Sequence, residues 1–405
     1  MKRRDVLRGM IGCSLAASPL VTPMSFAASP ALGDNRLVVI VLRGAMDGLD
    51  VVQPYGDPDL RGLRDRISVG PDKGALDLDG FFALHPRLET LMPLWKVGEL
   101  GFAHAVSTPY RERRSHFDGQ DLLEAGVASL QGKPRDGWMN RMLQNMPGVV
   151  SETAYSIGQD RMFMMHGDAK VSDWSPDLGV NMTPQGQRLL DLVMHDDPLF
   201  QAASAEAMEI LASLESGASG GVPEDGMMME GMEMMAPAKE GSTGRVADFA
   251  ASRLRGDTRI AAFSIGGWDT HSNQRRGINR ALDQLAGTLL RLRQGVGRDV
   301  WGKTAVVAMT EFGRTARENG TAGTDHGTGG MALFAGGAIR GGRVLGDWPG
   351  LAEVDLYARR DLMPTRDVRA YAAWAIRGLY GLDKTIIENA VFPGLEMGMD
   401  PGLIA

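Results

Sequence analysis

The chain has 405 residues, a formal net charge of -7 at pH 7 and one cysteine, Cys13. The negative charge disfavours a nucleic-acid partner. Because Cys13 lies in a leader that we expect to be removed, an internal disulfide, thiolate catalysis and cysteine-ligated metals are all excluded for the mature chain.

The N-terminus has the pattern of a twin-arginine export signal. Residues 2–7 read K-R-R-D-V-L, and an apolar region then leads to the small-residue site S-F-A at 25–27. This pattern predicts recognition by the twin-arginine translocation machinery and removal of residues 1–27. We expect a periplasmic or secreted protein with no stable membrane span after cleavage, since no later apolar run approaches the spanning length.

Apolar runs rich in β-branched residues predict buried strands at 36–42, 100–106, 260–265, 305–309 and 331–334. Between the third and fourth of these, apolar residues recur every three or four positions, which indicates one buried face of a helix and therefore a βαβ unit. The predicted fold is α/β, with a mostly parallel central sheet covered by helices on both faces. Residues 28–405 are expected to form one domain.

Two further helices are predicted, at 133–142 and at 367–380; Thr365 or Asp367 is the expected cap of the second helix and Gly381 its stop. Residues 217–244 lose all periodicity and are rich in Gly, Pro, Glu and Met. Such a composition predicts a disordered, Met-rich surface insertion.

Polar residues follow the predicted strands at the points where they end. Asp47 follows the first strand, and the alternative to a functional role is an ordinary turn with a capping aspartate. Further candidates follow the later strands: Asp269 and His271 in G-W-D-T-H, Glu311 and Arg314 in T-E-F-G-R-T, and Asp325 and His326 in D-H-G. The carboxyl ends of parallel strands share one edge of a sheet, and carboxylates beside histidines are typical of a metal site.

An arginine-dense segment precedes another predicted helix, with Arg114 and Ser115 at its entry. Free backbone N–H groups and guanidinium groups there suit an anion, which makes Ser115 the first candidate nucleophile and Thr108 the second. The alternative is that Ser115 is only the N-cap of the helix.

Together with the leader, the motifs R-G-A-M-D-G-L-D, R-S-H-F-D-G-Q-D, G-W-D-T-H, T-E-F-G-R-T and D-H-G resemble the exported DUF1501 family, which is similar to the alkaline phosphatase and sulfatase superfamily. The resemblance implies one or two divalent ions, zinc before others, between loops at strand ends. Asp47 then matches the first carboxylate and Ser115 the nucleophile. Asp269 with His271 matches the Asp and nearby His of that pattern. No histidine follows His326, so Glu311 matches the strand-end pair and His326 the final histidine, with Asp325 beside it.

The sequence departs from the superfamily pattern where Asp269 and His271 stand two residues apart instead of four, and where Phe312 replaces an expected second ligand. Set against the resemblance, these departures imply that one metal position is weakened or lost and that Arg314 supplies fixed positive charge for part of the missing ion. The resemblance implies a metal-dependent hydrolase of phosphoric or sulfuric esters that acts on a small anionic ester, with Arg114 and Arg314 as charge-stabilising residues. The alternative is a non-catalytic exported protein that keeps the fold for binding or surface assembly.

Overall fold

The structure is a computed structural model that describes residues 32–67, 70–111, 114–132, 135–158, 162–176 and 242–405. The expected leader and most of the predicted Met-rich insertion lie outside these residues. No helix in the described part of the chain is long and apolar enough to cross a membrane.

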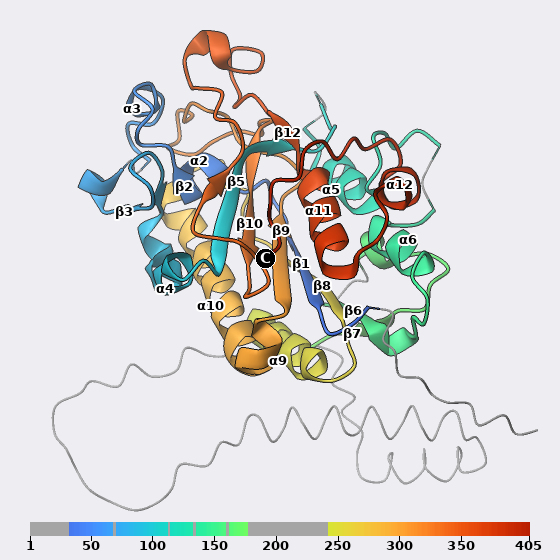
Figure 1. Cartoon of the computed structure of the whole chain (residues 1–405). Coiled ribbons are helices and arrows are strands. Elements are labelled where there is room, and N and C mark those ends of the chain that lie inside the picture. The colour runs from blue at the N-terminus through green and yellow to red at the C-terminus, as the bar shows by residue number, and fades with distance from the viewer. Residues whose placement is uncertain (1–31, 68–69, 112–113, 133–134, 159–161, 177–241) are drawn as a thin grey trace, which may run out of the picture.

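A central sheet dominates the described chain (Figure 1). Its strands are β1 (Arg36–Leu42), β5 (Leu100–Ser107), β6 (Ala154–Ile157), β7 (Ser172–Trp174), β8 (Ile260–Ile265), β9 (Thr304–Met309), β10 (Gly330–Ala335), β11 (Val344–Leu345) and β12 (Arg366–Asp367). Their order is β11-β5-β10-β9-β1-β8-β6-β7, with β12 beside β5. Within this described sheet, β10 alone runs antiparallel to its neighbours. The prediction of a mostly parallel sheet is confirmed, and each of the five predicted strands lies within a residue of its observed bounds.

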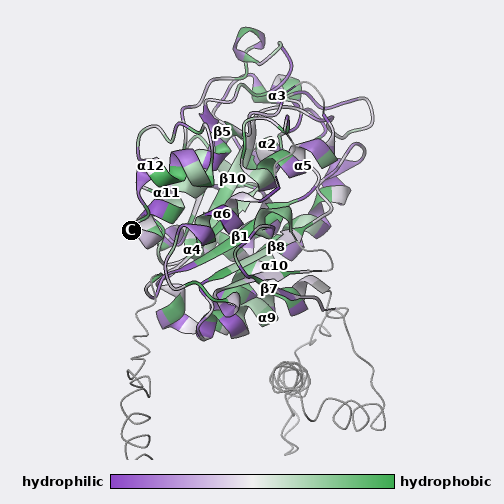
Figure 2. Ribbon diagram, turned by 90° about the vertical axis from the view of Figure 1, so that its right-hand side faces the viewer, coloured by the Kyte–Doolittle hydropathy of each residue, from purple (hydrophilic) through white to green (hydrophobic). Residues whose placement is uncertain are grey.

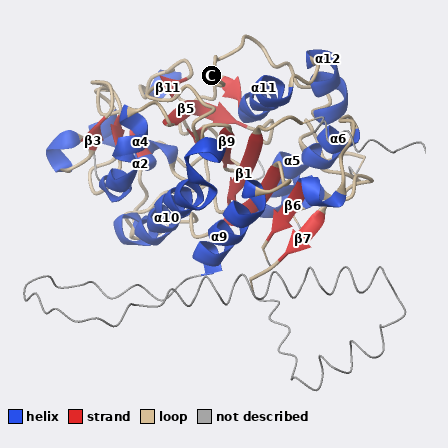
Figure 3. Cartoon of the chain, turned by 60° about the horizontal axis from the view of Figure 1, so that its bottom comes forward, coloured by secondary structure: helices blue, strands red, loops and turns tan. Residues whose placement is uncertain are grey.

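Helices cover both faces of the sheet, as predicted (Figure 3). One face packs against α4 (Met92–Lys96), α9 (Ser242–Arg255) and α10 (Gln274–Trp301), and the other against α5 (His116–Ala125), α6 (Trp138–Gln144) and α11 (Val368–Tyr380). Shorter elements are the helices α2 (Gly48–Val51), α3 (Leu60–Leu63) and α12 (Lys384–Ile386) and a small sheet of β2 (Val52–Gln53), β3 (Leu76–Asp77) and β4 (Ala83–Leu84).

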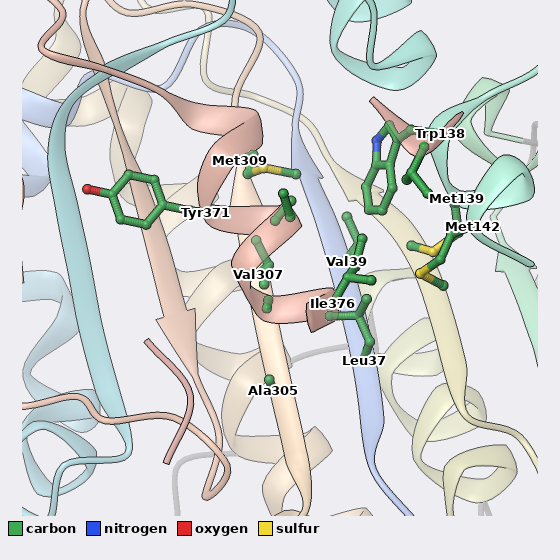
Figure 4. Packing of buried hydrophobic residues seen from close by; sticks show 14 of the residues in the cluster. Leu37, Val39, Trp138, Met139, Met142, Ala305, Val307, Met309, Tyr371 and Ile376 are labelled. Carbon is green, nitrogen blue, oxygen red and sulfur yellow. The ribbon is translucent and has the colours of Figure 1, made fainter. Parts of the chain in front are cut away.

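Strand β1 shows why a continuous apolar run was needed. Val39 points into the core beneath α11 and α6, whereas Val38 and Ile40 point into the core beneath α9 and α10. Figure 4 shows Val39 beside Ile376 of α11, and Figure 2 shows apolar strands inside a more polar outer layer. A strand covered on both faces cannot alternate polar and apolar residues.

Two predicted boundaries are corrected. The helix expected at 133–142 begins only at Trp138, because a Cβ on Gly137 would lie 2.2 Å from the Met164 Cα, so a close backbone contact precedes the helix. The insertion expected at 217–244 ends before Ser242, where α9 begins and buries residues such as Val246 and Phe249 against α10 and β8. The helix α11 has the expected cap, with Asp367 accepting from the Arg369 amide, and ends at Gly381 in a left-handed conformation (φ 66°).

Candidate metal centre at the carboxyl edge of the sheet

The strands β1, β8 and β9 run parallel in register, so their carboxyl ends lie level at one edge of the sheet. The loop after β8 carries Asp269 and His271, and the loop after β9 carries Glu311. His326 precedes β10, and because β10 runs in the opposite direction, its amino end lies at this same edge. Helix α5 begins there as well, with His116 as its first residue.

Three histidines surround Asp269, and we call His116, His271, His326 and Asp269 the histidine–aspartate cluster. The Nε2 atoms of His116, His271 and His326 lie 3.3, 3.0 and 3.2 Å from the nearest Asp269 carboxylate oxygen. The Nε2 atoms of His271 and His326 lie 3.0 Å apart. The structure thus brings together three of the sequence-predicted metal residues and adds His116.

The outer nitrogen of every histidine in the cluster has its own acceptor. Nδ1 of His116 lies 2.8 Å from Glu311, Nδ1 of His271 lies 3.2 Å from Asp325, and Nδ1 of His326 lies 2.9 Å from the Arg114 carbonyl oxygen. A neutral imidazole carries one proton, and an acceptor at Nδ1 holds that proton there. With the Nδ1 proton held in this way, each Nε2 is left free to bind a cation, which is the arrangement that supporting carboxylates and carbonyls give to metal-binding histidines.

This arrangement fits a cation. Nε2 of His116 is buried and has no hydrogen-bond partner among the described residues, and the Nε2 atoms of His271 and His326 crowd against each other and against Asp269. His116, Asp269 and His326 offer ligand atoms that lie within 4.8 Å of one another. Ligand atoms of a tetrahedral zinc ion lie about 3.3 Å apart, which matches the contacts to Asp269. Imidazole and carboxylate are both ligands that zinc accepts.

Glu311 supports the cluster through its contact with His116. Its side chain is 0% exposed and accepts hydrogen bonds from the Gly44 amide (2.9 Å), the Gln120 amide group (3.1 Å) and the Thr310 hydroxyl (3.0 Å). Burial acts to raise the pKa of Glu311, but the hydrogen bond with His116 and those from neighbouring amides hold it below its ordinary value. The hydrogen bond to Glu311 in turn raises the pKa of His116. Glu311 therefore reaches the cluster through His116 instead of through a direct contact with His271 or His326.

Arg314 supports Asp269 through a hydrogen bond and its positive charge. Its guanidinium is 0% exposed and donates from Nη1 to Asp269 Oδ1 at 2.8 Å. Burial acts to raise the pKa of Asp269, yet the hydrogen bond and charge of Arg314 keep it below its ordinary value. Burial also lowers the pKa of His326. These shifts keep the Asp269 carboxylate ionised and the His326 imidazole neutral, the states in which both can bind a metal.

Asp47 lies away from the cluster, contrary to the sequence-based expectation that it would stand opposite the histidines. It is buried in an ion pair with Arg64, with Nη1 and Nη2 of the guanidinium 2.6 and 3.0 Å from its two carboxylate oxygens. It also caps α2 by accepting from the Leu49 amide. The capping alternative describes what the structure shows. The carboxylate oxygens of Asp47 contact Arg64 and Gln274, and among the described residues no histidine of the cluster contacts them.

Ser115 is the N-cap of α5, and its hydroxyl accepts from the Asp118 amide at 3.4 Å. Arg114 is exposed, and its backbone has a positive φ of 52°, which turns its carbonyl toward His326. Phe312 stacks on the ring of His116 at a centroid distance of 5.3 Å. The aromatic residue that replaces an expected ligand therefore forms part of the wall of the cluster.

The mouth of the cluster is open. Asp269 and His271 keep 43% and 47% of their side-chain surfaces exposed. A cavity of about 630 Å³ adjoins Asp325 and is lined also by Thr315, Arg317 and Arg360. A small polar molecule can therefore approach the cluster from solvent.

Sequence reasoning missed His116 as a cluster residue. It stands in the motif R-S-H-F-D-G-Q-D directly after Ser115, whose hydroxyl was the predicted nucleophile. The signal that identifies it is its position as the first residue of a helix that follows a strand ending at the same sheet edge. Gln120 lies one turn further along α5 and donates to Glu311.

Comparison with solved structures finds partial overlays. The lipoteichoic acid synthase LtaP from Listeria monocytogenes gives a TM-score of 0.39 at 9% identity, over 92% of this chain and 77% of that chain. Ps i-CgsB gives 0.40 at 11% identity, over 88% and 75%. BT1596, a 2-O GAG sulfatase, gives 0.30 at 11% identity, over 77% and 66%. Overlays at these scores carry no information about activity.

A search of curated proteins finds no match to this sequence. A family model does match, over residues 95–387, and its description is a protein of unknown function, DUF1501. The match takes in β5, β8, β9 and β10 and every residue of the histidine–aspartate cluster. The chain belongs to the DUF1501 family.

Proposed function

We propose that the protein is an exported, metal-dependent hydrolase of phosphoric or sulfuric esters. The observation that carries the proposal is the convergence of three imidazole Nε2 atoms on Asp269, each with its Nδ1 held by an acceptor. His116, Asp269 and His326 would hold a divalent ion, zinc in the first place, and His271 would approach it from the open side. When bound, such an ion polarises an ester oxygen and lowers the pKa of a nearby hydroxyl or water.

The surrounding residues have distinct tasks in this proposal. Arg314 neutralises part of the charge of Asp269, and its Nη2 has no hydrogen-bond partner among the described residues, so it adds fixed positive charge beside an anionic ester. Ser115 lies at the start of α5, where the positive end of the helix dipole favours an anion, and its hydroxyl or a water is the nucleophile. Arg114 is exposed beside it and attracts the substrate.

Glu311 and Asp325 orient histidines in this proposal and do not bind the ion. Glu311 holds Nδ1 of His116, and Asp325 holds Nδ1 of His271. Replacing such supporting carboxylates typically weakens metal affinity about 10- to 100-fold. Asp325→Asn should therefore retain a weakened site.

Metal analysis of the purified mature protein tests the proposal first. We expect near-stoichiometric zinc, loss of zinc in His326→Ala and retention in His166→Ala, because His166 contacts Phe163 outside the cluster. The protein should then hydrolyse p-nitrophenyl phosphate or p-nitrophenyl sulfate, lose this activity in a chelator and regain it with zinc. Absence of metal from the parent protein, with no uptake on addition, would overturn the proposal.

A non-catalytic exported binding or surface-assembly protein is the second candidate. Two observations favour it: Phe312 fills part of the wall beside His116, and the Ser115 hydroxyl is engaged as a helix cap. The same experiment separates the two candidates. Stoichiometric zinc without hydrolysis of either ester would favour the second.

A further inference from the structure

We propose that Thr324 is a positioning residue, and that it orients Arg314 against Asp269 through a hydrogen-bond relay anchored by Gln274. The relay begins at the buried carboxylates of Asp47 and Asp50 and ends in the histidine–aspartate cluster. The inference rests on the proposed function in one respect, since it takes the cluster to bind a metal.

The direction of the Gln274 side chain is fixed by its surroundings. Gln274 is fully buried, and its Nε2 donates to Asp47 Oδ2 at 2.5 Å and to Asp50 Oδ2 at 2.8 Å. Both N–H bonds of the amide are therefore in use, and its Oε1 must face the other way. There it accepts from the hydroxyls of Thr270 (2.9 Å) and Thr324 (2.8 Å).

The direction of the Thr324 hydroxyl follows from this. A threonine hydroxyl has one proton, and Thr324 gives it to Gln274, so the oxygen is left to accept. It accepts from Nε of Arg314 at 3.1 Å, and Nη1 of the same guanidinium donates to Asp269 at 2.8 Å. Thr324 and Arg314 are both almost fully buried, so water offers no ready replacement.

The hydrogen bond from Arg314 to Thr324 sets the orientation of the guanidinium and leaves its charge unchanged. The guanidinium is planar, so fixing Nε on Thr324 also fixes where Nη1 meets Asp269. Asp269 is the one residue that all three inward-facing histidine nitrogens approach. Without the Thr324 acceptor, the buried Nε is left unpaired, and the guanidinium gains by turning toward another acceptor. Asp269 then loses its alignment with the histidines.

Zinc affinity of the mature protein tests the relay, by competition with a chelator and by the absorption bands of the cobalt-substituted protein. Thr324→Val, which keeps the shape and loses the hydroxyl, should weaken affinity about 10-fold or more, as loss of an outer partner of a metal site does. Thr324→Ser should restore affinity close to that of the parent. Thr270→Val is the matched control, because Thr270 donates to the same Gln274 oxygen without touching Arg314.

Equal zinc affinities in Thr324→Val and Thr270→Val would overturn the inference. If Thr324→Val does not fold, Thr324→Ala replaces it in the same comparison. If the parent binds neither zinc nor cobalt, the proposed function fails, and the relay is judged from metal-free crystal structures instead. The inference then holds if the Arg314 guanidinium moves away from Asp269 in the Thr324 variant but stays in the Thr270→Val control, and it falls if both keep the parent contact.

Discussion

At the scale of single residues, the ion pair between Asp47 and Arg64 differs from the surface pairs in its burial. Both side chains are 1% exposed, whereas those of Arg61 and Asp72 are 60% and 55% exposed. Removing one partner of a buried pair typically costs about 3–5 kcal/mol, because it leaves an unpaired buried charge, whereas water screens an exposed pair and makes its loss cheap. We expect Arg64→Met to destabilise by the larger amount and Arg61→Met by the smaller, measured by urea unfolding. Equal small losses would contradict the structure.

Asp50 gives a prediction about pH. Burial, together with the nearby charge of Asp47, raises the pKa of Asp50 to about 6. A carboxyl whose pKa is raised in the folded state stabilises that state below its unfolded value of 3.8, and this contribution is lost as pH rises through about 6.

Asp50→Asn removes this titration. Between pH 5 and pH 8, the unfolding free energy of the variant should therefore rise relative to that of the parent. Urea unfolding in a chelator measures the difference, with the exposed Asp65→Asn as control. A difference that does not change with pH would contradict the expected shift.

The residues that sequence reasoning placed correctly at the sheet edge follow strands or precede a strand that returns to that edge. Asp269 could be predicted in this way, because its loop leaves the carboxyl end of a parallel strand, whereas the place of His326 depends also on the direction of β10. Asp47 could not, because its position depends on Arg64, which reaches it from the end of α3. The sequence gives no periodic pattern from which the contact between Arg64 and Asp47 could be predicted, because α3 is only one turn long.

At the scale of elements, the connection between β9 and β10 folds back on itself, and its two arms, one carrying Arg314 and the other His326, pair as a short antiparallel bridge. The Gly327 amide donates to the Gly313 carbonyl at 2.8 Å, and the Thr315 amide donates to the Asp325 carbonyl at 2.9 Å. A Cβ on Gly327 would lie 2.4 Å from the backbone of Arg314, so the pairing requires glycine there. This close contact explains why glycine stands at the third position of the motif D-H-G.

Gly327→Ala should separate these two arms, weaken zinc binding and lower the melting temperature. Gly320→Ala is the matched control, since a Cβ at Gly320 meets nothing within 4 Å. Zinc competition and thermal unfolding measure both effects. If Gly327→Ala behaved as the control does, the two arms would not be as close together as the structure places them.

The Met-rich segment gives a second prediction at this scale. Deleting residues 217–241 should leave the fold intact, because the segment has no apolar face to bury and the cost of loop length is only logarithmic. The deletion stops before α9, whose packing must be kept. Thermal unfolding should shift by no more than a few degrees. A large drop, not reversed by a Gly-Ser segment of equal length, would show that the residues themselves contribute to stability.

At the scale of the whole molecule, the central sheet was predictable because its strands are covered on both faces and therefore appear as continuous apolar runs, as in β1 and β9. The reversal of β10 was not, because its buried sequence, G-M-A-L-F-A, is equally compatible with either direction. That reversal is what brings His326 to the same edge as Asp269. Strand order likewise depends on packing of distant elements, which local patterns do not encode.

The leader gives the last prediction, and it concerns where the whole molecule is found. The twin-arginine pattern depends on the guanidinium groups of Arg3 and Arg4 and not on their charge alone. Replacing both by lysine should leave the protein in the cytoplasm, as measured by fractionation of expressing cells. Replacing only the nearby Arg8 by lysine is the control and should leave export unchanged, because Arg8 stands outside the arginine pair. Periplasmic yield that stayed at the parent level in the double variant would mean that another export route recognises the leader.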